Sequence, residues 1–106
     1  MYRKRLPDDL CERGVFLDSL GIWEYAWKYE DIIKVIEYIE KNDMFILGGD
    51  VYRITENSIE ALGDNWYIES VRNIKPKDSI DETMKYINDY YVKNGNQYIY
   101  SLVIQS

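Results

Sequence analysis

Histidine is absent from the 106 residues of this chain, and cysteine occurs once, as Cys11. Histidine is the usual general base near neutral pH and the commonest metal ligand, so its absence argues against most classes of enzyme. A zinc site needs a cluster of cysteine and histidine, and no stretch has the spaced oxygen ligands of an EF-hand. We therefore expect no catalytic residue, no metal and no other cofactor. Burial as a small hydrophobic residue is the expected role of Cys11.

Long hydrophobic runs are also missing. No apolar stretch approaches the roughly 20 residues that a membrane span requires. The basic amino terminus runs into Pro7 and two aspartates rather than into an apolar segment. One cysteine cannot form an internal disulfide, which favours a reducing compartment. We expect a cytoplasmic protein with no membrane partner, whose residues 1–106 form a single domain.

Basic residues are scarce in the middle of the chain. The net charge is −6, and twelve acidic residues face four basic ones between residues 14 and 71. Such a field repels nucleic acid and anionic membranes, and it speeds encounter with a basic protein. The alternative is that the acidic residues only keep the protein soluble. From the charge we expect no nucleic-acid partner.

Two segments have the hydrophobic period of an amphipathic helix. In residues 30–42, isoleucine and valine recur three and four positions apart, with charged residues between them. A second helix is predicted to begin at Ser79, which forms a capping box with Glu82, and to end before Gly95. Residues 7–13 are predicted to form a short additional helix.

The remaining apolar segments indicate β-strands. Gly63-Asp64-Asn65 is predicted to be a turn. The last strand is apolar on both alternating faces, which is typical of a central strand. The order of elements predicts an α+β fold, with a small, mainly antiparallel sheet and two principal helices packed against it. The predicted strands are residues 15–17, 22–27, 44–55, 66–68 and 98–104.

The segment ILGGDVY, residues 46–52, places two glycines in a predicted strand. Its glycines match neither a dinucleotide-binding fingerprint nor a P-loop. Two structural explanations remain open. Gly48 and Gly49 could form a two-residue hairpin turn, or they could lie in one long strand where an aromatic ring or another backbone presses close. Asp50 could accept hydrogen bonds from nearby backbone N–H groups.

Aromatic residues are abundant, with eleven tyrosines and three tryptophans. Tyrosine and tryptophan are residues that anchor protein interfaces. Most of these rings are expected around the core. Part of the set, next to carboxylates, is expected to form an exposed patch.

An ordered set of motifs resembles the immunity protein 40 family of bacterial polymorphic toxin systems. The set comprises the segment EYAW at residues 24–27, the helix that follows it, GGDVY at residues 48–52 and NWY at residues 65–67. The resemblance implies an α+β cytoplasmic protein that binds the toxin domain encoded beside it and blocks it. The oligomeric state is not implied.

The resemblance and the composition together give the candidate residues. We expect the toxin domain to be basic, and the glycine pair to serve the fold. The residues expected to bind the toxin are Glu24, Trp27, Asp50, Tyr52, Glu56, Trp66 and Tyr67. Those expected to have a structural role in the motifs are Gly48, Gly49, Val51 and Asn65.

Two other functions stay open from the sequence. The chain could be an acidic regulatory or adaptor module that binds some other basic protein. It could also be a small metal-assisted hydrolase, for which Asp50 and its neighbours are the candidates.

Overall fold

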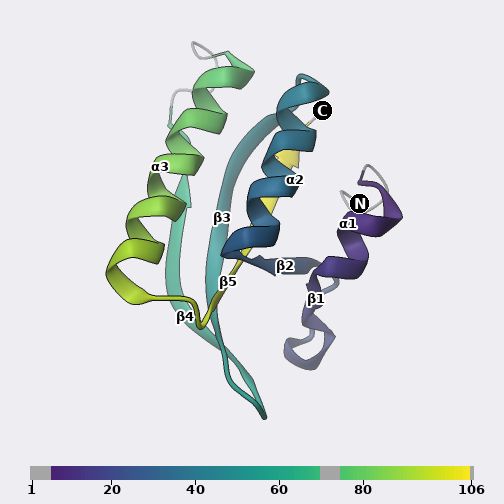
Figure 1. The fold of residues 1–106 in the computed structure, drawn as a ribbon, viewed down its shortest axis with the longest axis vertical. Coiled ribbons are helices and arrows are strands. Elements are labelled where there is room, and N and C mark those ends of the chain that lie inside the picture. The colour runs from purple at the N-terminus through teal and green to yellow at the C-terminus, as the bar shows by residue number, and fades with distance from the viewer. Residues whose placement is uncertain (1–5, 70–74, 106) are drawn as a thin grey trace.

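The computed structural model describes residues 6–69 and 75–105, which form three α-helices, one short 3-10 helix and a five-stranded sheet. The strand order is β1-β2-β5-β3-β4, and all neighbouring strands are antiparallel (Figure 1). The predicted α+β fold is therefore confirmed. The elements are α1 (Asp8–Arg13), β1 (Val15–Phe16), the 3-10 helix η2 (Leu17–Leu20), β2 (Tyr25–Lys28), α2 (Tyr29–Lys41), β3 (Phe45–Ile54), β4 (Ile59–Tyr67), α3 (Pro76–Asn94) and β5 (Tyr98–Gln105).

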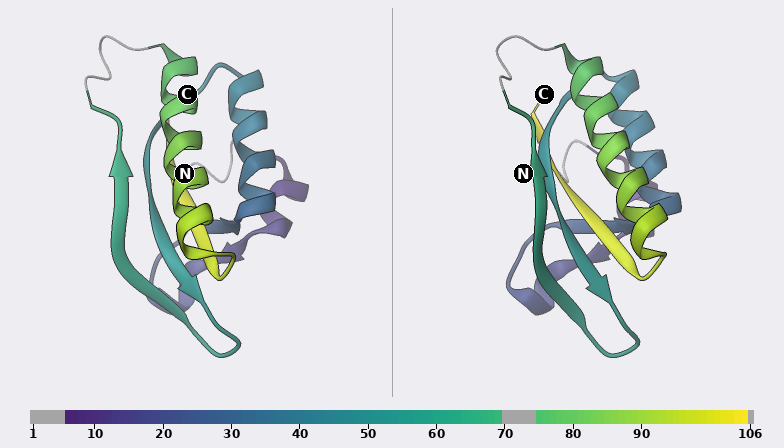
Figure 2. Two further views of the ribbon diagram at one scale, coloured as in Figure 1. Left: turned by 60° about the vertical axis from the view of Figure 1, so that its left-hand side comes forward. Right: turned by 90° about the vertical axis from the view of Figure 1, so that its left-hand side faces the viewer.

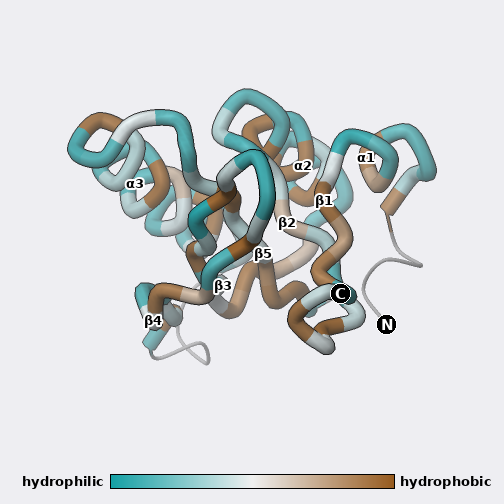
Figure 3. Tube along the Cα trace, turned by 90° about the horizontal axis from the view of Figure 1, so that it is seen from below, coloured by the Kyte–Doolittle hydropathy of each residue, from teal (hydrophilic) through white to brown (hydrophobic). Residues whose placement is uncertain are grey.

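Helices α2 and α3 lie side by side on one face of the sheet (Figure 2). Hydrophobic residues gather between the helices and the strands, while the outer turns of α2 are hydrophilic (Figure 3). The helix predicted for residues 30–42 is confirmed as α2, since its buried residues are those at helical spacing. The main core includes Ile32, Val35, Ile36, Ile39, Ile46, Val51, Ile80, Ile87, Tyr100, Leu102 and Ile104.

Strand β5 is central, because it pairs with β2 on one side and β3 on the other. Tyr100 and Leu102 belong to the main core beneath the helices. Ile99 points to the opposite face, since successive side chains alternate along a strand. The central position predicted from the apolar alternation is confirmed.

Described residues cover only part of the sheet face that lies away from the helices. Leu17 from η2 packs there against Ala26, Tyr52 and Ile99 in a second, smaller core. Farther along the same face, Tyr67 on β4 and Val103 on β5 are exposed. The amino-terminal segment thus covers one half of this face and leaves the other half, around the glycine pair of β3, without a covering layer among the described residues.

The predicted turn at residues 63–65 is wrong, because these residues lie inside the continuous strand β4. Gly63 has a φ angle of 80°, and the pairing of β3 with β4 shifts register between Asp50 and Tyr52. A left-handed glycine at a register shift is a β-bulge. The turn signal marks a bend within a strand, and the chain reverses at residues 55–58 instead.

The predicted start of the second helix at Ser79 is also wrong, since α3 begins about one turn earlier at Pro76. There the Asp78 carboxylate accepts a hydrogen bond from the backbone N–H of Lys75 at 2.9 Å. Ser79 is fully buried. Its hydroxyl donates to the carbonyl of Pro76 at 2.7 Å and accepts from the backbone N–H of Ile46 at 3.1 Å. Ser79 therefore ties α3 to β3 rather than capping the helix.

The other local predictions differ less. Helix α1 confirms the short helix expected in residues 7–13, and α3 ends at Asn94, with Gly95 after it at a φ angle of 89°. Strand β1 ends at Phe16, because Leu17 enters the 3-10 helix. Strand β2 is shifted toward the carboxyl end of the predicted segment 22–27, since it comprises Tyr25–Lys28. Cys11 is half-buried and packs against the main core.

Candidate functional site

The glycine pair lies in the middle of β3, hydrogen-bonded to strands on both sides. Gly48 is the register partner of Tyr67 on β4 and of Val103 on β5. A Cβ atom at Gly49 would collide with the carbonyl oxygen of Ser101 and with the Trp66 ring, and one at Gly48 with the Trp66 carbonyl oxygen. Of the two structural explanations, the structure has the single long strand with a ring pressed against it.

Trp66 packs under the helices, on the core side of the sheet. Its ring lies against Gly49 and stacks on the Tyr86 ring with 4.7 Å between centroids. The indole N–H donates to the Thr83 hydroxyl at 3.2 Å. Trp66 is 8% exposed, so its ring offers almost no surface to a partner and instead fastens β4 to α3.

On the sheet face away from the helices, three rows of register partners run across strands β4, β3 and β5. Residues opposite one another in paired strands point to the same side of the sheet. The outermost row has glycine at its centre, the middle row has a carboxylate there, and the innermost row has a tyrosine that is part of the second core. The rows are Tyr67, Gly48 and Val103; Asn65, Asp50 and Ser101; and Ala61, Tyr52 and Ile99.

A shallow groove of about 330 Å³ lies along the outer rows. Gly48 contributes no side chain, so the groove floor is backbone, and Tyr67 and Val103 stand on either side of it. Tyr67 is 70% exposed and Val103 is 45% exposed. The groove is lined by Leu47, Gly48, Gly49, Asp50, Asn65, Trp66, Tyr67 and Val103.

The carboxylate of Asp50 lines the groove, and that of Glu24 lies close enough to interact with it electrostatically. Glu24 precedes β2, and its pKa is raised above the ordinary value by burial and by the negative charge of Asp50. The pKa of Tyr52 is raised by burial and then by Asp50, while a hydrogen bond from the Ser101 side chain lowers it. In the described part of the chain, no ion pair involves Glu24 or Asp50. This leaves two neighbouring negative charges beside an apolar groove.

The structure brings some of the expected toxin-binding residues together and separates others. Glu24, Asp50, Tyr52 and Tyr67 lie on the sheet face away from the helices, although Tyr52 is part of the second core and only 6% exposed. Trp27, by contrast, is fully buried.

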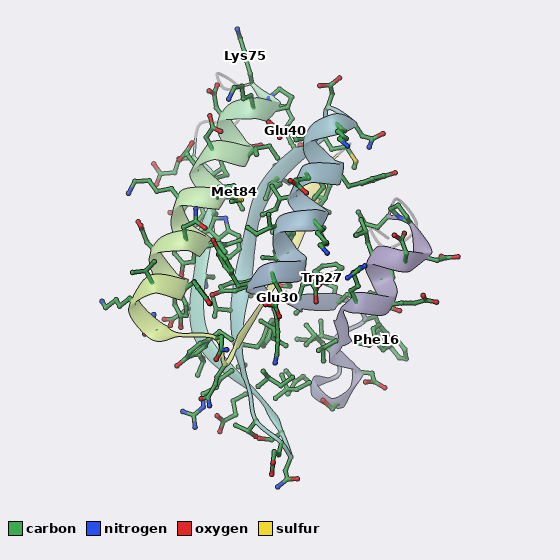
Figure 4. All side chains as sticks on the ribbon, in the orientation of Figure 1. Phe16, Trp27, Glu30, Glu40, Lys75 and Met84 are labelled. Carbon is green, nitrogen blue, oxygen red and sulfur yellow. The ribbon has the colours of Figure 1, made fainter. Side chains whose placement is uncertain are left out.

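Trp27 lies on the side of α2 that faces α1 (Figure 4). Its N–H donates to the carbonyl of Leu10 at 2.7 Å, so the ring holds α1 in place and has no surface for a partner. Glu56 is exposed in the turn between β3 and β4, beyond the end of the groove. Val51 is part of the main core, and Asn65 is exposed at the groove.

Three residues of the groove region were missed by the sequence reasoning: Leu47, Ser101 and Val103. All three lie in apolar segments where alternation indicates only that a strand is buried on both faces. The pairing register places Val103 and Ser101 beside β3. That register involves strands about 50 residues apart in the chain, so no local signal identifies it.

Residues 6–69 and 75–105 contain no group of three or more acidic or cysteine side chains placed to hold a metal ion. Within the same ranges, no helix is long and apolar enough to cross a membrane.

Comparison with known proteins gives one match. A family model described as "Immunity protein 40" matches residues 16–104. The matched region runs from β1 to β5, so it includes the glycine pair, the groove and both carboxylates. No curated protein and no solved structure matches this chain.

Proposed function

Because this chain belongs to the immunity protein 40 family, we propose that it binds a cognate bacterial toxin domain and neutralises it as a stoichiometric inhibitor, without chemistry of its own. The observation that carries the proposal is the family match, which extends over most of the chain. The protein would act in the cytoplasm of the producing cell, where it meets the toxin domain.

The physical character of the chain supports this function. Its net charge of −6 favours a basic toxin domain, because complementary charge raises the rate of productive encounter. Exposed Tyr67 and Val103 offer apolar area that a partner can bury, and buried aromatic contacts slow dissociation. Fast association and slow dissociation together are what a protective inhibitor needs.

Co-expression tests the proposal. The toxin domain encoded beside this gene is expressed in a susceptible bacterium with this protein, with an acidic protein of similar size and unrelated fold, or alone. We expect growth only with this protein, and a one-to-one complex on purification. If the toxin still kills at matched expression and no complex elutes, the proposed function is wrong.

A further inference from the structure

The uncovered half of the sheet is a rigid, partly apolar surface. Its floor is the middle of β3, which is hydrogen-bonded to β4 and β5. Tyr67 and Val103 stand on either side of Gly48 and expose 70% and 45% of their surfaces. A groove fixed by paired strands loses little conformational entropy when a partner fills it, so most of the contact energy is kept.

Among residues 6–69 and 75–105, no cation offsets the charge of Asp50, which lines the groove, or that of Glu24 beside it. Glu24 lies close enough to Asp50 for the Asp50 charge to raise its pKa, and no described cation pairs with either group. A partner that covers the groove would remove water from both carboxylates. Such burial is strongly unfavourable unless the partner supplies a cation that hydrogen-bonds to them.

The acidic surfaces of α2 and α3 lack this combination. The outer face of α2 carries Glu30, Glu37 and Glu40, but Lys34 and Lys41 alternate with them, and no exposed large hydrophobic side chain lies on it. Alternating charge on a helix is typical of a solvated surface.

The outer face of α3 is also mixed, with ion pairs between lysine and aspartate one turn apart. The exposed hydrophobic residue of α3, Val92, lies one turn from Asp89, which is paired with Lys85. The groove differs in joining exposed apolar area to negative charge that has no cation partner among the described residues.

Given the proposed function, on which this inference rests, we propose that the toxin domain docks on this half of the sheet and places an arginine side chain between Glu24 and Asp50. The guanidinium group has five donors in a planar fork, which suits two carboxylates from different segments of the chain. Its planar, weakly hydrated face also packs on aromatic rings such as that of Tyr67. Apolar residues next to this arginine would fill the groove over Gly48.

The binding experiment compares two pairs of neutralised carboxylates. The probe is the toxin domain encoded by the adjacent gene, inactivated by substitution and immobilised for kinetic measurement. Glu24→Gln with Asp50→Asn removes the charge at the groove, and Glu37→Gln with Glu40→Gln removes the same charge from α2. We expect the first pair to weaken binding about 30-fold or more and the second pair to change it by less than about threefold.

A second comparison tests the exposed apolar side chain of Tyr67 at the groove. Tyr67→Ala is expected to weaken binding about tenfold, and Val92→Ala, at an 83% exposed position on α3, to leave it unchanged. Circular dichroism and thermal melting of each variant separate lost binding from lost folding.

Replacing each arginine of the toxin domain in turn identifies the side chain that binds the carboxylates. Replacement of that arginine should weaken binding to the wild-type protein. It should cause little further loss of binding to the Glu24→Gln, Asp50→Asn variant. Coupling to a lysine instead of an arginine would overturn the assignment of the side chain.

Two results would overturn the docking site, and a third would reject the proposed function. Unchanged binding by the groove variants, with loss in the α2 variants, would place the toxin elsewhere while the proposed function stands. A dimer of this chain that Tyr67→Ala abolishes, with toxin binding intact, would make a second copy the occupant. Failure of the wild-type protein to bind or neutralise the toxin would instead reject the proposed function.

Discussion

At the scale of single residues, two polar groups, those of Glu24 and Tyr100, lie in environments that lower the free energy of unfolding. Glu24 is held beside another carboxylate, and the hydroxyl of fully buried Tyr100 has no hydrogen-bond partner in the described part of the chain. An unsatisfied or repelled group lowers stability. Glu24 lies beside the groove residue Asp50, whereas Tyr100 lies in the main core. The cost of each group to stability can therefore be measured by a separate substitution.

Replacing Glu24 by Gln should raise stability at neutral pH and not in acid. The pKa of Glu24 is raised in the folded protein by burial and by Asp50, so folding favours the protonated form. The stability that this form contributes is present below the ordinary pKa and is lost as the pH rises through the raised pKa. Urea unfolding at pH 7 should therefore show a more stable variant, and the difference should vanish near about pH 3.5. A difference that persists in acid would indicate a change in packing instead.

Replacing Tyr100 by Phe should leave stability unchanged or raise it, by up to about 1 kcal/mol. Its hydroxyl is buried without a partner among the described residues, and burial, with neighbouring tyrosines, raises the pKa of Tyr100 to about 12. Tyr29→Phe is the matched control, because the Tyr29 hydroxyl donates to the Asn88 side-chain oxygen at 2.6 Å. That control should lose about 1 kcal/mol in urea unfolding. A comparable loss for Tyr100→Phe would reveal a hydrogen bond to an internal water.

At the scale of elements, β3 connects two strands of the sheet and helix α3. It pairs with β4 and β5, and it contacts α3 through the hydroxyl of Ser79. Gly49 lets the Trp66 ring pack against β3, where the indole N–H reaches Thr83 on α3. Gly48 has no side chain to fill the groove on the opposite face. The ring packing and the groove thus each depend on one residue of the glycine pair.

Gly49→Ala should destabilise the protein by about 2 kcal/mol or more, because overpacking next to a backbone carbonyl cannot be relieved by a rotamer change. The added Cβ would meet the Ser101 carbonyl and the Trp66 ring. Urea unfolding measures the loss, with Val92→Ala as the control, since Val92 is 83% exposed. A loss below about 0.5 kcal/mol would show that β3 and β5 can separate at this point without cost.

Local pattern predicted the helices, the central strand and the fold class, because periodicity reports which faces are buried. It failed where contacts with distant parts of the chain determine the local conformation. Gly63 has the sequence of a turn, yet β3 extends alongside it and turns it into a bulge. Ser79 has the pattern of a cap, yet its hydroxyl is used by Ile46.

The candidate site was predicted only in part, for a related reason. Residue type pointed to aromatic and acidic side chains, but it did not distinguish Trp27 and Trp66, which are buried, from Tyr67, which is exposed. That distinction depends on the register of strands far apart in the chain. Glu24 and Asp50 illustrate the same limit, since their proximity follows from the sheet and not from their spacing.

At the scale of the whole molecule, charge and shape are divided between the two sides of the sheet. The helices present mixed charge to solvent. The uncovered half of the opposite face presents an apolar groove beside two carboxylates that pair with no cation in the part of the chain that the structure describes. A net charge of −6 acts at long range, whereas the groove acts only on contact. The first should control the association rate and the second the dissociation rate.

Raising the salt concentration should therefore slow association with the toxin domain and change dissociation little. Between about 50 and 500 mM NaCl we expect the association rate constant to fall about tenfold, because the Debye length shortens from about 14 Å to about 4 Å. Surface plasmon resonance with the inactivated toxin domain measures both rate constants. An association rate that does not depend on salt would mean that the acidic residues serve solubility alone.

The central claim is that this protein inhibits a toxin domain by binding it. Isothermal titration calorimetry of the purified protein with the inactivated toxin domain encoded by the adjacent gene tests it most directly. We predict one-to-one binding with a Kd on the order of 10⁻⁸ M or below, weakened by the substitution of Glu24 and Asp50 together. The absence of any binding between two folded, purified proteins would contradict the claim.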